Sequence, residues 1–260
     1  MKRFLLAFTL LAFAANVRAD EAADIVKKAV EAHGGEAALK KGKAGEASLT
    51  GEVVVQGTTM KFKARFAYMM PDKYSMSFDM DFMNMKVSME NIINGTKYKT
   101  IIDRMPQKLT DAQKGEIQAA FHLQEMILIY PLLDDKKYSL KVEKDAKVGD
   151  AEAKVLSATP KGGREVKLSF DKKTGLLLKT ARKSLNMLGA EVDEEATFGD
   201  YEKIDGIQTG MTLKVTQNGE PYMKAKIVEM KYLDQNRAVL LRGPGHEAGV
   251  IEVTTSDKRK

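Results

Sequence analysis

Two neighbouring stretches of the chain alternate apolar and polar side chains, and methionine and phenylalanine supply most of the apolar ones. Strict alternation over residues 60–68 and 74–82 is typical of half-buried antiparallel strands, because successive side chains of a strand point to opposite faces. The apolar positions are Met60, Phe62, Ala64, Phe66, Tyr68, Tyr74, Met76, Phe78, Met80 and Phe82. Methionine is flexible and polarizable, so a face lined with it can repack around apolar ligands of varied shape. A concave face with few polar groups suits an acyl chain.

The same face has a simpler interpretation, as an ordinary core, since methionine also fills irregular gaps beneath a covering helix. The residues alone leave both interpretations open. Asp79 and Asp81 fall on the opposite strand face, where we expect them to be solvated. Asp134-Asp135 and Glu194-Glu195 fall at turns or strand edges, and we expect the same of them.

Residues that usually perform catalysis or bind metals are few and scattered. His33, His122 and His246 are far apart in the sequence, and the chain has no cysteine to join them in a zinc site. His33 falls at the end of an expected helix, where a partial positive charge is favoured. The sequence contains no nucleophile elbow, phosphate loop or dinucleotide-binding fingerprint. We therefore expect no enzymatic activity, no metal site and no cofactor.

The first nineteen residues have the pattern of a secretory signal peptide. A short basic start precedes an apolar run from Phe4 to Ala15, and the small residue Ala19 stands where a signal peptidase would cut before Asp20. The run is too short to span a bilayer, which takes about 20 apolar residues. A retained membrane anchor is the weaker alternative. We therefore expect a soluble periplasmic protein.

The charge of the chain is modest once this segment is removed. The formal net charge of +6 falls to +3, because Lys2, Arg3 and Arg18 leave with the signal peptide. The remaining lysines alternate with acidic residues near expected turns, as solvated faces do. We therefore expect no nucleic-acid partner.

Two helices are expected among the strands. Residues 24–33 have apolar side chains at helical spacing and end at Gly34-Gly35, and residues 36–41 could add one more turn. A longer helix is expected over residues 110–130, where Thr110 and Gln113 form a capping box and Pro131 ends the pattern. Its apolar stripe comprises Ile117, Ala120, Phe121, Leu123, Ile127 and Leu128.

Strand patterns make up most of the remaining chain. They include a hairpin at Asn94-Gly95 and a turn over residues 171–175, in which Gly175 should need a positive φ. Further strands are expected over residues 137–143, 151–158, 165–171, 176–181, 194–201, 210–216 and 222–232. About eleven strands without a βαβ rhythm predict an α+β protein, with one curved or partly closed antiparallel sheet over helices. We expect one domain over residues 20–235 with a single core, and a loosely held tail over residues 236–260.

Five segments together resemble the outer-membrane lipoprotein-sorting, LolA/LolB-like family. Residues 23–39 resemble its opening helix, which ends in Gly-Gly, and residues 49–51 resemble the start of its first strand. Residues 70–74 resemble its proline-centred turn, residues 167–178 its Asp-Lys-Lys-Thr-Gly hairpin, and residues 198–207 its closing segment. The resemblance implies an incomplete, curved β-barrel with helices that plug or lid its open side.

The resemblance also implies a function, which is to hold lipid or lipoprotein acyl chains in a cavity between the sheet and the lid. The expected lining residues are Met60, Phe62, Phe66, Met76, Phe78 and Met80 from the sheet, with Phe121, Met126 and Leu128 from the lid. Such a carrier would act as a monomer and exchange its ligand with a membrane-bound donor or acceptor protein. The alternative is a periplasmic sensor or assembly domain of the same fold that binds a protein partner.

Two departures from the family narrow this expectation. Carriers that shuttle lipoproteins often have an arginine before the turn proline, where this chain has Met70. The receptor members of the family are anchored through a lipidated cysteine, which this chain lacks. The soluble-carrier side of the family therefore fits better than the receptor side.

Overall fold

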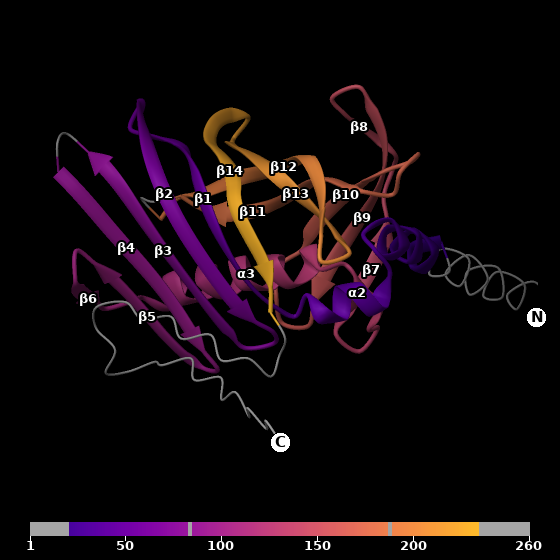
Figure 1. Cartoon of the computed structure of the whole chain (residues 1–260), viewed down its shortest axis with the longest axis horizontal. Coiled ribbons are helices and arrows are strands. Elements are labelled where there is room, and N and C mark those ends of the chain that lie inside the picture. Colours follow the sequence, from indigo (N-terminus) through magenta and orange to yellow (C-terminus); the bar gives the residue numbers. More distant parts are fainter. Residues whose placement is uncertain (1–20, 83–84, 187–188, 234–260) are drawn as a thin grey trace, which may run out of the picture.

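The alternating segments form one antiparallel sheet of fourteen strands (Figure 1). The computed structural model describes residues 21–82, 85–186 and 189–233. The strands are β1 (Ala44–Val55), β2 (Thr58–Met69), β3 (Lys73–Phe82), β4 (Met85–Asn94), β5 (Lys97–Ile102), β6 (Met105–Gln107), β7 (Tyr138–Val142), β8 (Ala146–Val148), β9 (Ala151–Pro160), β10 (Val166–Asp171), β11 (Leu177–Leu185), β12 (Glu191–Ile204), β13 (Ile207–Gln217) and β14 (Glu220–Tyr232).

The order of the strands leaves the sheet open. It runs β6-β5-β4-β3-β2-β1-β14-β13-β12-β11-β10-β9-β7, and β8 pairs with β9. The first and last long strands meet in the middle, because β1 pairs with both β2 and β14. The expected fold class, a curved and incomplete antiparallel barrel, is confirmed. The expected number of strands was too low, because β6 and β8 have three residues each, too few for an alternating pattern to be recognised.

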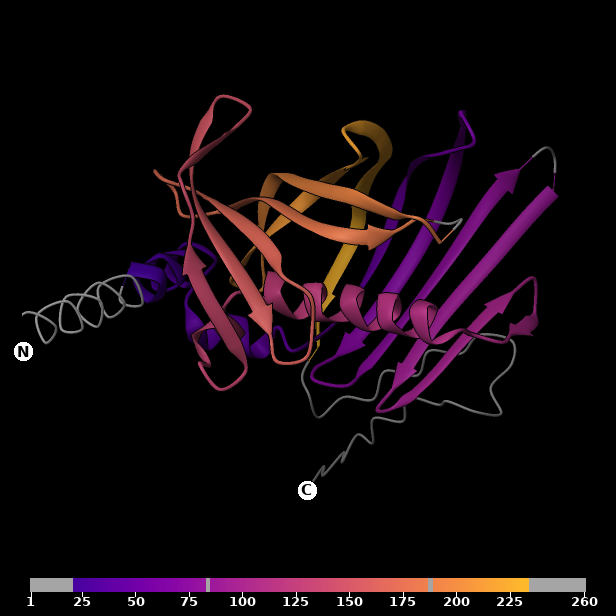
Figure 2. The same ribbon diagram turned by 180° about the vertical axis from the view of Figure 1, so that it is seen from behind.

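Helices cover the inner side of this sheet. A helix over residues 21–32 and α2 (Glu36–Lys41) lie near β7, and α3 (Asp111–Ile127) runs across the inner face (Figure 2). A short 3₁₀ helix, η1 (Tyr130–Leu133), follows α3. The curved sheet and α3 therefore enclose the space in which a ligand could be held.

Local sequence signals fix both ends of α3. The capping box is confirmed: the Thr110 N–H donates to Gln113 Oε1 at 2.9 Å, and the Gln113 N–H donates to Thr110 Oγ1 at 3.3 Å. The helix ends at Ile127, three residues before the expected end, because Ile129 adopts a φ of 63°. Pro131 instead lies at the start of η1, where its missing N–H and fixed φ are tolerated.

The turns expected at glycine positions are also present. Gly95 lies between β4 and β5 with a φ of 61°, and Gly175 lies between β10 and β11 with a φ of 79°. Only glycine adopts this conformation without strain. The position of Gly175 is crowded as well, since a Cβ atom there would meet the Ala32 Cβ at 3.1 Å. This turn therefore packs directly against the helix over residues 21–32.

The described residues form three apolar clusters instead of the single core expected from the sequence. The largest joins the helix over residues 21–32, α2 and the end of α3 to β7, β9, β10 and β11. A second cluster lies on β1–β3 and β14, and a third lies beneath α3 on β2 and β4. Curvature separates them, because a bent sheet with one helix across it cannot bring all its inner residues together.

Three expectations fall on residues outside the described ones. These are the signal peptide over residues 1–19, its cleavage before Asp20 and the tail over residues 236–260. Within residues 21–233, no described helix is long and apolar enough to cross a membrane.

Candidate ligand cavity

An apolar cavity of about 310 Å³ lies between α3 and the inner face of the sheet. Its walls come from α3, from β1 and β2, and from β11 to β14. The apolar and aromatic lining residues are Leu39, Leu49, Phe66, Tyr68, Ala120, Leu123, Ile127, Leu128, Leu177, Ala196, Phe198, Tyr201, Ile207, Leu213, Val215, Tyr222, Met223, Ile227, Met230 and Tyr232. Such a lining can surround an apolar chain without offering it hydrogen bonds.

One face of α3 forms the roof of the cavity. Ala120, Leu123, Gln124 and Ile127 follow one another at helical spacing, so they share one face. Leu123 and Ile127 are only half-buried, although they face the apolar side of the sheet. Their remaining accessible surface is available to an apolar ligand.

The hydroxyls of three of the four lining tyrosines have hydrogen-bond partners. The Tyr201 hydroxyl donates to the Leu177 carbonyl, and the Tyr68 hydroxyl donates to the Gly42 carbonyl at 3.0 Å. The Tyr232 hydroxyl lies 2.9 Å from Thr209 Oγ1. Burial raises the pKa of Tyr201 and Tyr232 above the ordinary tyrosine value. These hydroxyls are therefore neutral and the rings present apolar faces to the cavity.

His33 is a buried and neutral part of the cavity wall. Its Nδ1 donates to the Ala29 carbonyl at 2.7 Å, and its Nε2 accepts from the Leu177 N–H at 3.4 Å. Its ring packs edge-on against Tyr201, with 5.8 Å between the ring centroids. Burial lowers its pKa. The expected partial positive charge at this helix end is therefore wrong, because desolvation outweighs the helix dipole.

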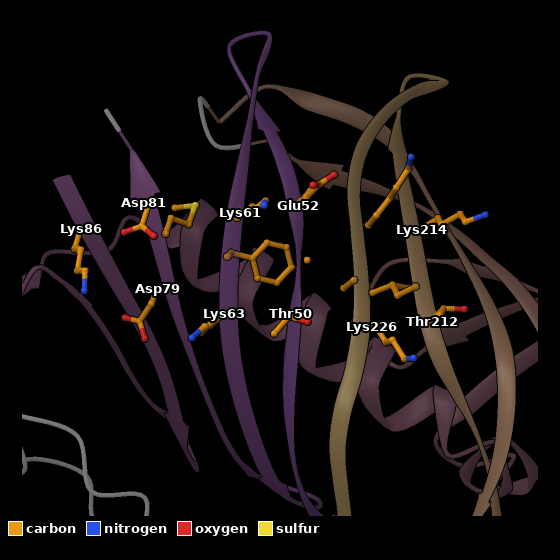
Figure 3. Close-up of a pocket in the computed structure, with 16 residues that line it drawn as sticks. Thr50, Glu52, Lys61, Lys63, Asp79, Asp81, Lys86, Thr212, Lys214 and Lys226 are labelled. Atoms are coloured by element: carbon orange, nitrogen blue, oxygen red, sulfur yellow. The ribbon is translucent and has the colours of Figure 1, made fainter. Parts of the chain in front are cut away.

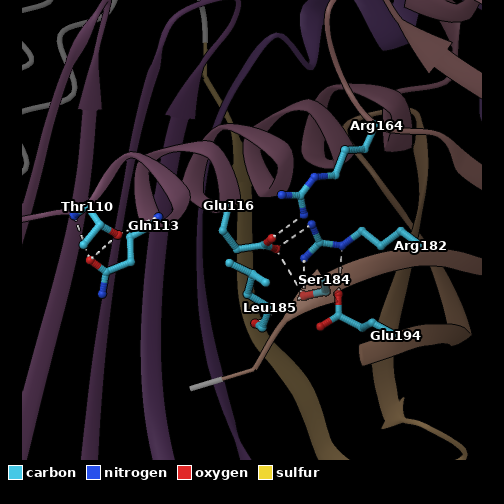
Figure 4. A network of polar contacts seen from close by, with 8 residues as sticks. All are labelled: Thr110, Gln113, Glu116, Arg164, Arg182, Ser184, Leu185 and Glu194. Carbon is cyan, nitrogen blue, oxygen red and sulfur yellow. Dashed lines mark hydrogen bonds and ion pairs between the residues drawn. The ribbon is translucent and has the colours of Figure 1, made fainter. Parts of the chain in front are cut away.

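A network of charged groups fastens the first half of α3 to the sheet (Figure 4). Glu116 on α3 lies 2.9 Å from Arg182 Nη1 on β11 and 3.1 Å from Arg164 Nη1. The Ser184 hydroxyl donates to the same carboxylate at 3.1 Å. Arg182 also donates through Nε to Glu194 on β12 at 2.9 Å. We call Glu116, Arg164, Arg182, Ser184 and Glu194 the α3 latch.

Burial makes the latch more than a surface salt bridge. The side chain of Arg182 is 9% exposed, and those of Glu116 and Glu194 are 18% and 17% exposed. The expectation that Glu194 is solvated was therefore wrong: its strand position turns it inward, where it faces Arg182 across β11 and β12. Although Arg182 Nη1 is close to Glu116, its hydrogen is not aligned for a hydrogen bond, so this contact is an ion pair.

A second buried carboxylate fastens the other half of α3. Glu125 is 6% exposed and forms a salt bridge with Lys137. The Tyr138 hydroxyl donates to Glu125 Oε2 at 2.8 Å, and burial beside this carboxylate raises the pKa of Tyr138. The helix is therefore held at both halves, and its apolar stripe faces the cavity.

The structure separates the nine residues expected to line a ligand site. Phe66 and Leu128 line the cavity. Met60, Phe62 and Phe78 are buried in the second apolar cluster, and Met76 and Met80 are partly buried beside them. Phe121 extends from α3 into the third cluster, and Met126 lies fully buried in the largest one. The rings of Phe62 and Phe78 stack with 4.3 Å between their centroids.

Most of the cavity wall comes from strands whose contribution the sequence did not indicate. Tyr222 and Met223 on β14 and Leu213 on β13 belong to strands that were expected, but the place of β14 between β1 and β13 was not. The alternation of these residues was the available signal. It gives no strand order, however, and the pairing of β1 with β14 joins segments from opposite ends of the described chain.

The described residues contain no group of three or more histidine, aspartate or glutamate side chains that could hold a metal ion. The buried charged groups around the cavity are all engaged in the two anchors of α3. The arrangement is therefore suited to enclosing an apolar group.

Comparison with known proteins gives a match in fold alone. No protein-family model matches the sequence, and a search of curated proteins finds no match. Among solved structures, a LolA superfamily protein from Nitrosomonas europaea matches with a TM-score of 0.53 and 13% identity, over 82% of this chain and 94% of that one. A domain from Vibrio parahaemolyticus, assigned to outer membrane lipoprotein sorting, matches with a TM-score of 0.52 and 14% identity, over 84% of this chain and 96% of that one.

A DUF1329 family protein from Desulfovibrio piger also matches, with a TM-score of 0.50 and 14% identity, over 81% of this chain and 92% of that one. The three matches cover nearly the whole length of the other proteins. The chain therefore has the fold of the LolA superfamily, as the resemblance of its motifs predicted.

The α3 latch should contribute strongly to stability. Glu116→Gln should lower the free energy of unfolding by about 2–3 kcal/mol, because it leaves Arg182 poorly compensated in a site with little water. A double-mutant cycle with Arg182→Met, followed by chemical denaturation, should give a coupling energy of about 1–3 kcal/mol.

The control is the exposed pair Lys183–Asp193, which joins β11 to β12 next to Arg182. Its side chains are 56% and 67% exposed. Its coupling energy should not exceed about 1 kcal/mol. Equal coupling in the two pairs would show that the latch is no stronger than a surface salt bridge.

His33 should make stability depend on pH. Burial lowers the pKa of His33 below the ordinary histidine value of 6.5, so the unfolded chain binds a proton more readily than the folded protein does. Stability should therefore be fully present above pH 6.5 and fall as the pH decreases below it. Thermal unfolding of wild type and His33→Gln across this range should show a weaker pH dependence in the variant.

His122→Gln is the comparison variant. This half-buried histidine on α3 bonds to Gln118 and lies outside the cavity wall. Burial lowers the pKa of His122 as well, so this variant should lose a smaller part of the pH dependence than His33→Gln. An identical pH profile for wild type and His33→Gln would contradict the assignment of His33.

Proposed function

We propose that this chain is a periplasmic carrier that holds the acyl chain of a lipid or a lipoprotein in the cavity beneath α3. The observation that carries the proposal is the apolar cavity of about 310 Å³, roofed by a helix that is anchored at both halves. Its volume lies at the lower end of the range of about 300–1,000 Å³ that is typical of small-molecule sites.

Binding in this cavity would be driven by burial. Each CH₂ group transferred from water contributes about 0.8 kcal/mol, and the half-buried Leu123 and Ile127 would be covered at the same time. Most of the lining is apolar, and the hydroxyls of Tyr68, Tyr201 and Tyr232 are engaged with backbone carbonyls or with Thr209. The site would therefore select for an apolar chain and tolerate different lengths.

The methionine face would extend the site for a longer chain. Met76 and Met80 are partly accessible beside the buried Phe62 and Phe78, and Phe66 belongs to the same strand face. We propose that an acyl chain longer than the cavity continues from Phe66 along these residues. Phe121 and Met126, which belong to α3, would then hold the helix in place through their packing in the third and the largest apolar clusters.

Export and processing before Asp20 complete the proposal. The signal-peptide pattern supports a periplasmic location, and the related folds include a protein named for outer membrane lipoprotein sorting. The mature chain would act as a monomer with one domain over residues 20–235, and it would exchange its ligand with a membrane-bound donor or acceptor. We propose no catalytic step and no cofactor.

A second candidate function is supported by the edge of the sheet at β6. Ile102 and Met105 are 37% and 66% exposed there, next to the unpaired side of an edge strand. An exposed apolar edge can accept a strand from another protein. A sensor or assembly domain of the same fold would use this edge and leave the cavity empty.

A cavity-filling variant tests the carrier proposal. Leu123→Trp places a larger side chain into the space beneath α3, so it should weaken binding of a dansyl-labelled fatty acid by about tenfold or more. Val228→Trp on the outer face of β14, where the wild-type residue is 56% exposed, is the matched control and should bind like wild type. Fluorescence titration measures binding, and circular dichroism checks the fold.

The variant Phe78→Ala separates the cavity from its proposed extension. If the methionine face takes part, Phe78→Ala should change the affinity for a long acyl probe more than for a short one. A wild-type protein that binds no acyl probe, or a Leu123→Trp variant that binds it unchanged, would contradict the carrier proposal and favour the partner-binding candidate.

A further inference from the structure

The outer face of the sheet carries a charged hollow of about 940 Å³ (Figure 3). It lies over β13, β14, β1, β2, β3 and the start of β4. Its walls carry six lysines, Lys61, Lys63, Lys86, Lys214, Lys224 and Lys226. Three acidic residues, Glu52, Asp79 and Asp81, share it. The hollow therefore has a surplus of three positive charges.

This hollow is separate from the cavity beneath α3. Thr50 and Lys224 border the hollow, whereas their strand neighbours Leu49 and Met223 line the cavity. Leu213 contributes to both sites, so they share part of one wall. Successive residues of a strand point to opposite faces, so the two sites lie on opposite sides of the same sheet.

The surplus charge is concentrated over β13 and β14. Lys214 and Lys224 are directly opposite each other in the pairing of these strands, and Lys226 is the next outward residue of β14. Lys226 faces Thr212 on one side and Thr50 on the other. Like charges placed directly opposite each other destabilise a sheet. A negatively charged partner at this end would relieve that repulsion.

In the strand pairing of the described chain, Glu52 on β1 is directly opposite Lys224, while Lys214 and Lys226 face no acidic residue. None of the three lysines forms a salt bridge there, although Lys231, also on β14, pairs with both Glu229 and Glu46. Exposed lysines close to carboxylates usually pair with them. The absence of pairing among the described residues leaves the three ammonium groups available to another molecule.

At the opposite end of the hollow, acidic and basic side chains balance each other. Asp79 and Asp81 project from β3, opposite Lys63 and Lys86 on the neighbouring strands. The distance from β4 to β13 corresponds to five strand spacings, or about 24 Å. An extended polypeptide of about seven residues has this length. A partner with its negative charges at one end would thus be oriented by the hollow.

The shape and the charge distribution favour a polypeptide over a membrane surface. A flat bilayer would meet the rim of the hollow and not its floor, whereas an extended polypeptide could lie along it. The balanced end over β2 to β4 and the positive end over β13 and β14 together favour a polypeptide whose carboxylates lie at one end.

We propose that the outer hollow binds an acidic polypeptide segment of a partner protein, whose carboxylates meet Lys214, Lys224 and Lys226. The segment crosses the strands from β13 toward β3. The interaction is separate from ligand binding beneath α3, so it does not depend on the carrier function.

Fluorescence anisotropy with a synthetic peptide tests this proposal. The probe is a fluorescein-labelled peptide of alternating Glu and Gly residues that is long enough to span the hollow, and a Gln-Gly peptide of equal length is the control ligand. Wild type should bind the acidic peptide and not the neutral one, and added salt should weaken binding. The triple variant Lys214→Gln, Lys224→Gln, Lys226→Gln should bind it about tenfold more weakly.

A second triple variant controls for overall charge. Lys147, Lys161 and Lys203 are exposed, lie outside the hollow and form no salt bridge with a described residue. Their replacement by glutamine should leave the affinity within about twofold of wild type. If this variant weakens binding as much as the first, or if wild type does not distinguish the two peptides, the proposal is overturned.

Two further measurements complete the test. Asp79→Asn with Asp81→Asn should strengthen binding of the acidic peptide, a gain that a merely misfolded variant could not produce. Phosphatidylglycerol vesicles should bind wild type no better than phosphatidylcholine vesicles do. Vesicle binding that requires the three lysines, without peptide binding, would replace the peptide with a membrane surface. Binding of the fatty-acid probe should be the same in all of these variants.

Discussion

Glu116 and Arg182 meet at 2.9 Å between α3 and β11, in a region where both side chains have lost most of their contact with water. Desolvating two charges is costly, and the cost is offset only while the ions stay in close contact and their other groups are satisfied. Arg164, Ser184 and Glu194 supply those further contacts. The height of α3 above the sheet is thus set by a polar contact that resists displacement in either direction.

The cavity follows from this constraint. With α3 fixed through Glu116 in its first half and through Glu125 in its second half, its apolar stripe cannot move down to fill the space over β12 and β13. Leu123 and Ile127 therefore remain half-buried over a sheet lined with aromatic and aliphatic side chains. An apolar ligand can complete the packing that the anchors prevent the protein from completing itself.

Features encoded by neighbouring residues could be predicted from the sequence, and features that depend on strand order could not. The capping box at Thr110, the glycine turn at Gly175 and the alternation over residues 60–82 need only a few consecutive residues, and each is present. Glu194 was misplaced because its inward direction depends on a pairing with β11 that its own segment does not specify. The location of the cavity was missed for the same reason, since β1 and β14 join distant parts of the chain. The methionine face was recognised, but the deepest space lies farther along the sheet.

The central claim is that the protein holds an acyl chain beneath α3. The most direct measurement is mass spectrometry of an organic extract from the mature protein, purified natively from the periplasm. Our account predicts acyl lipids close to one per protein molecule, and their loss when the protein is unfolded and refolded before extraction. An extract without acyl lipid, from a protein that also gains none when incubated with membrane lipids, would contradict it.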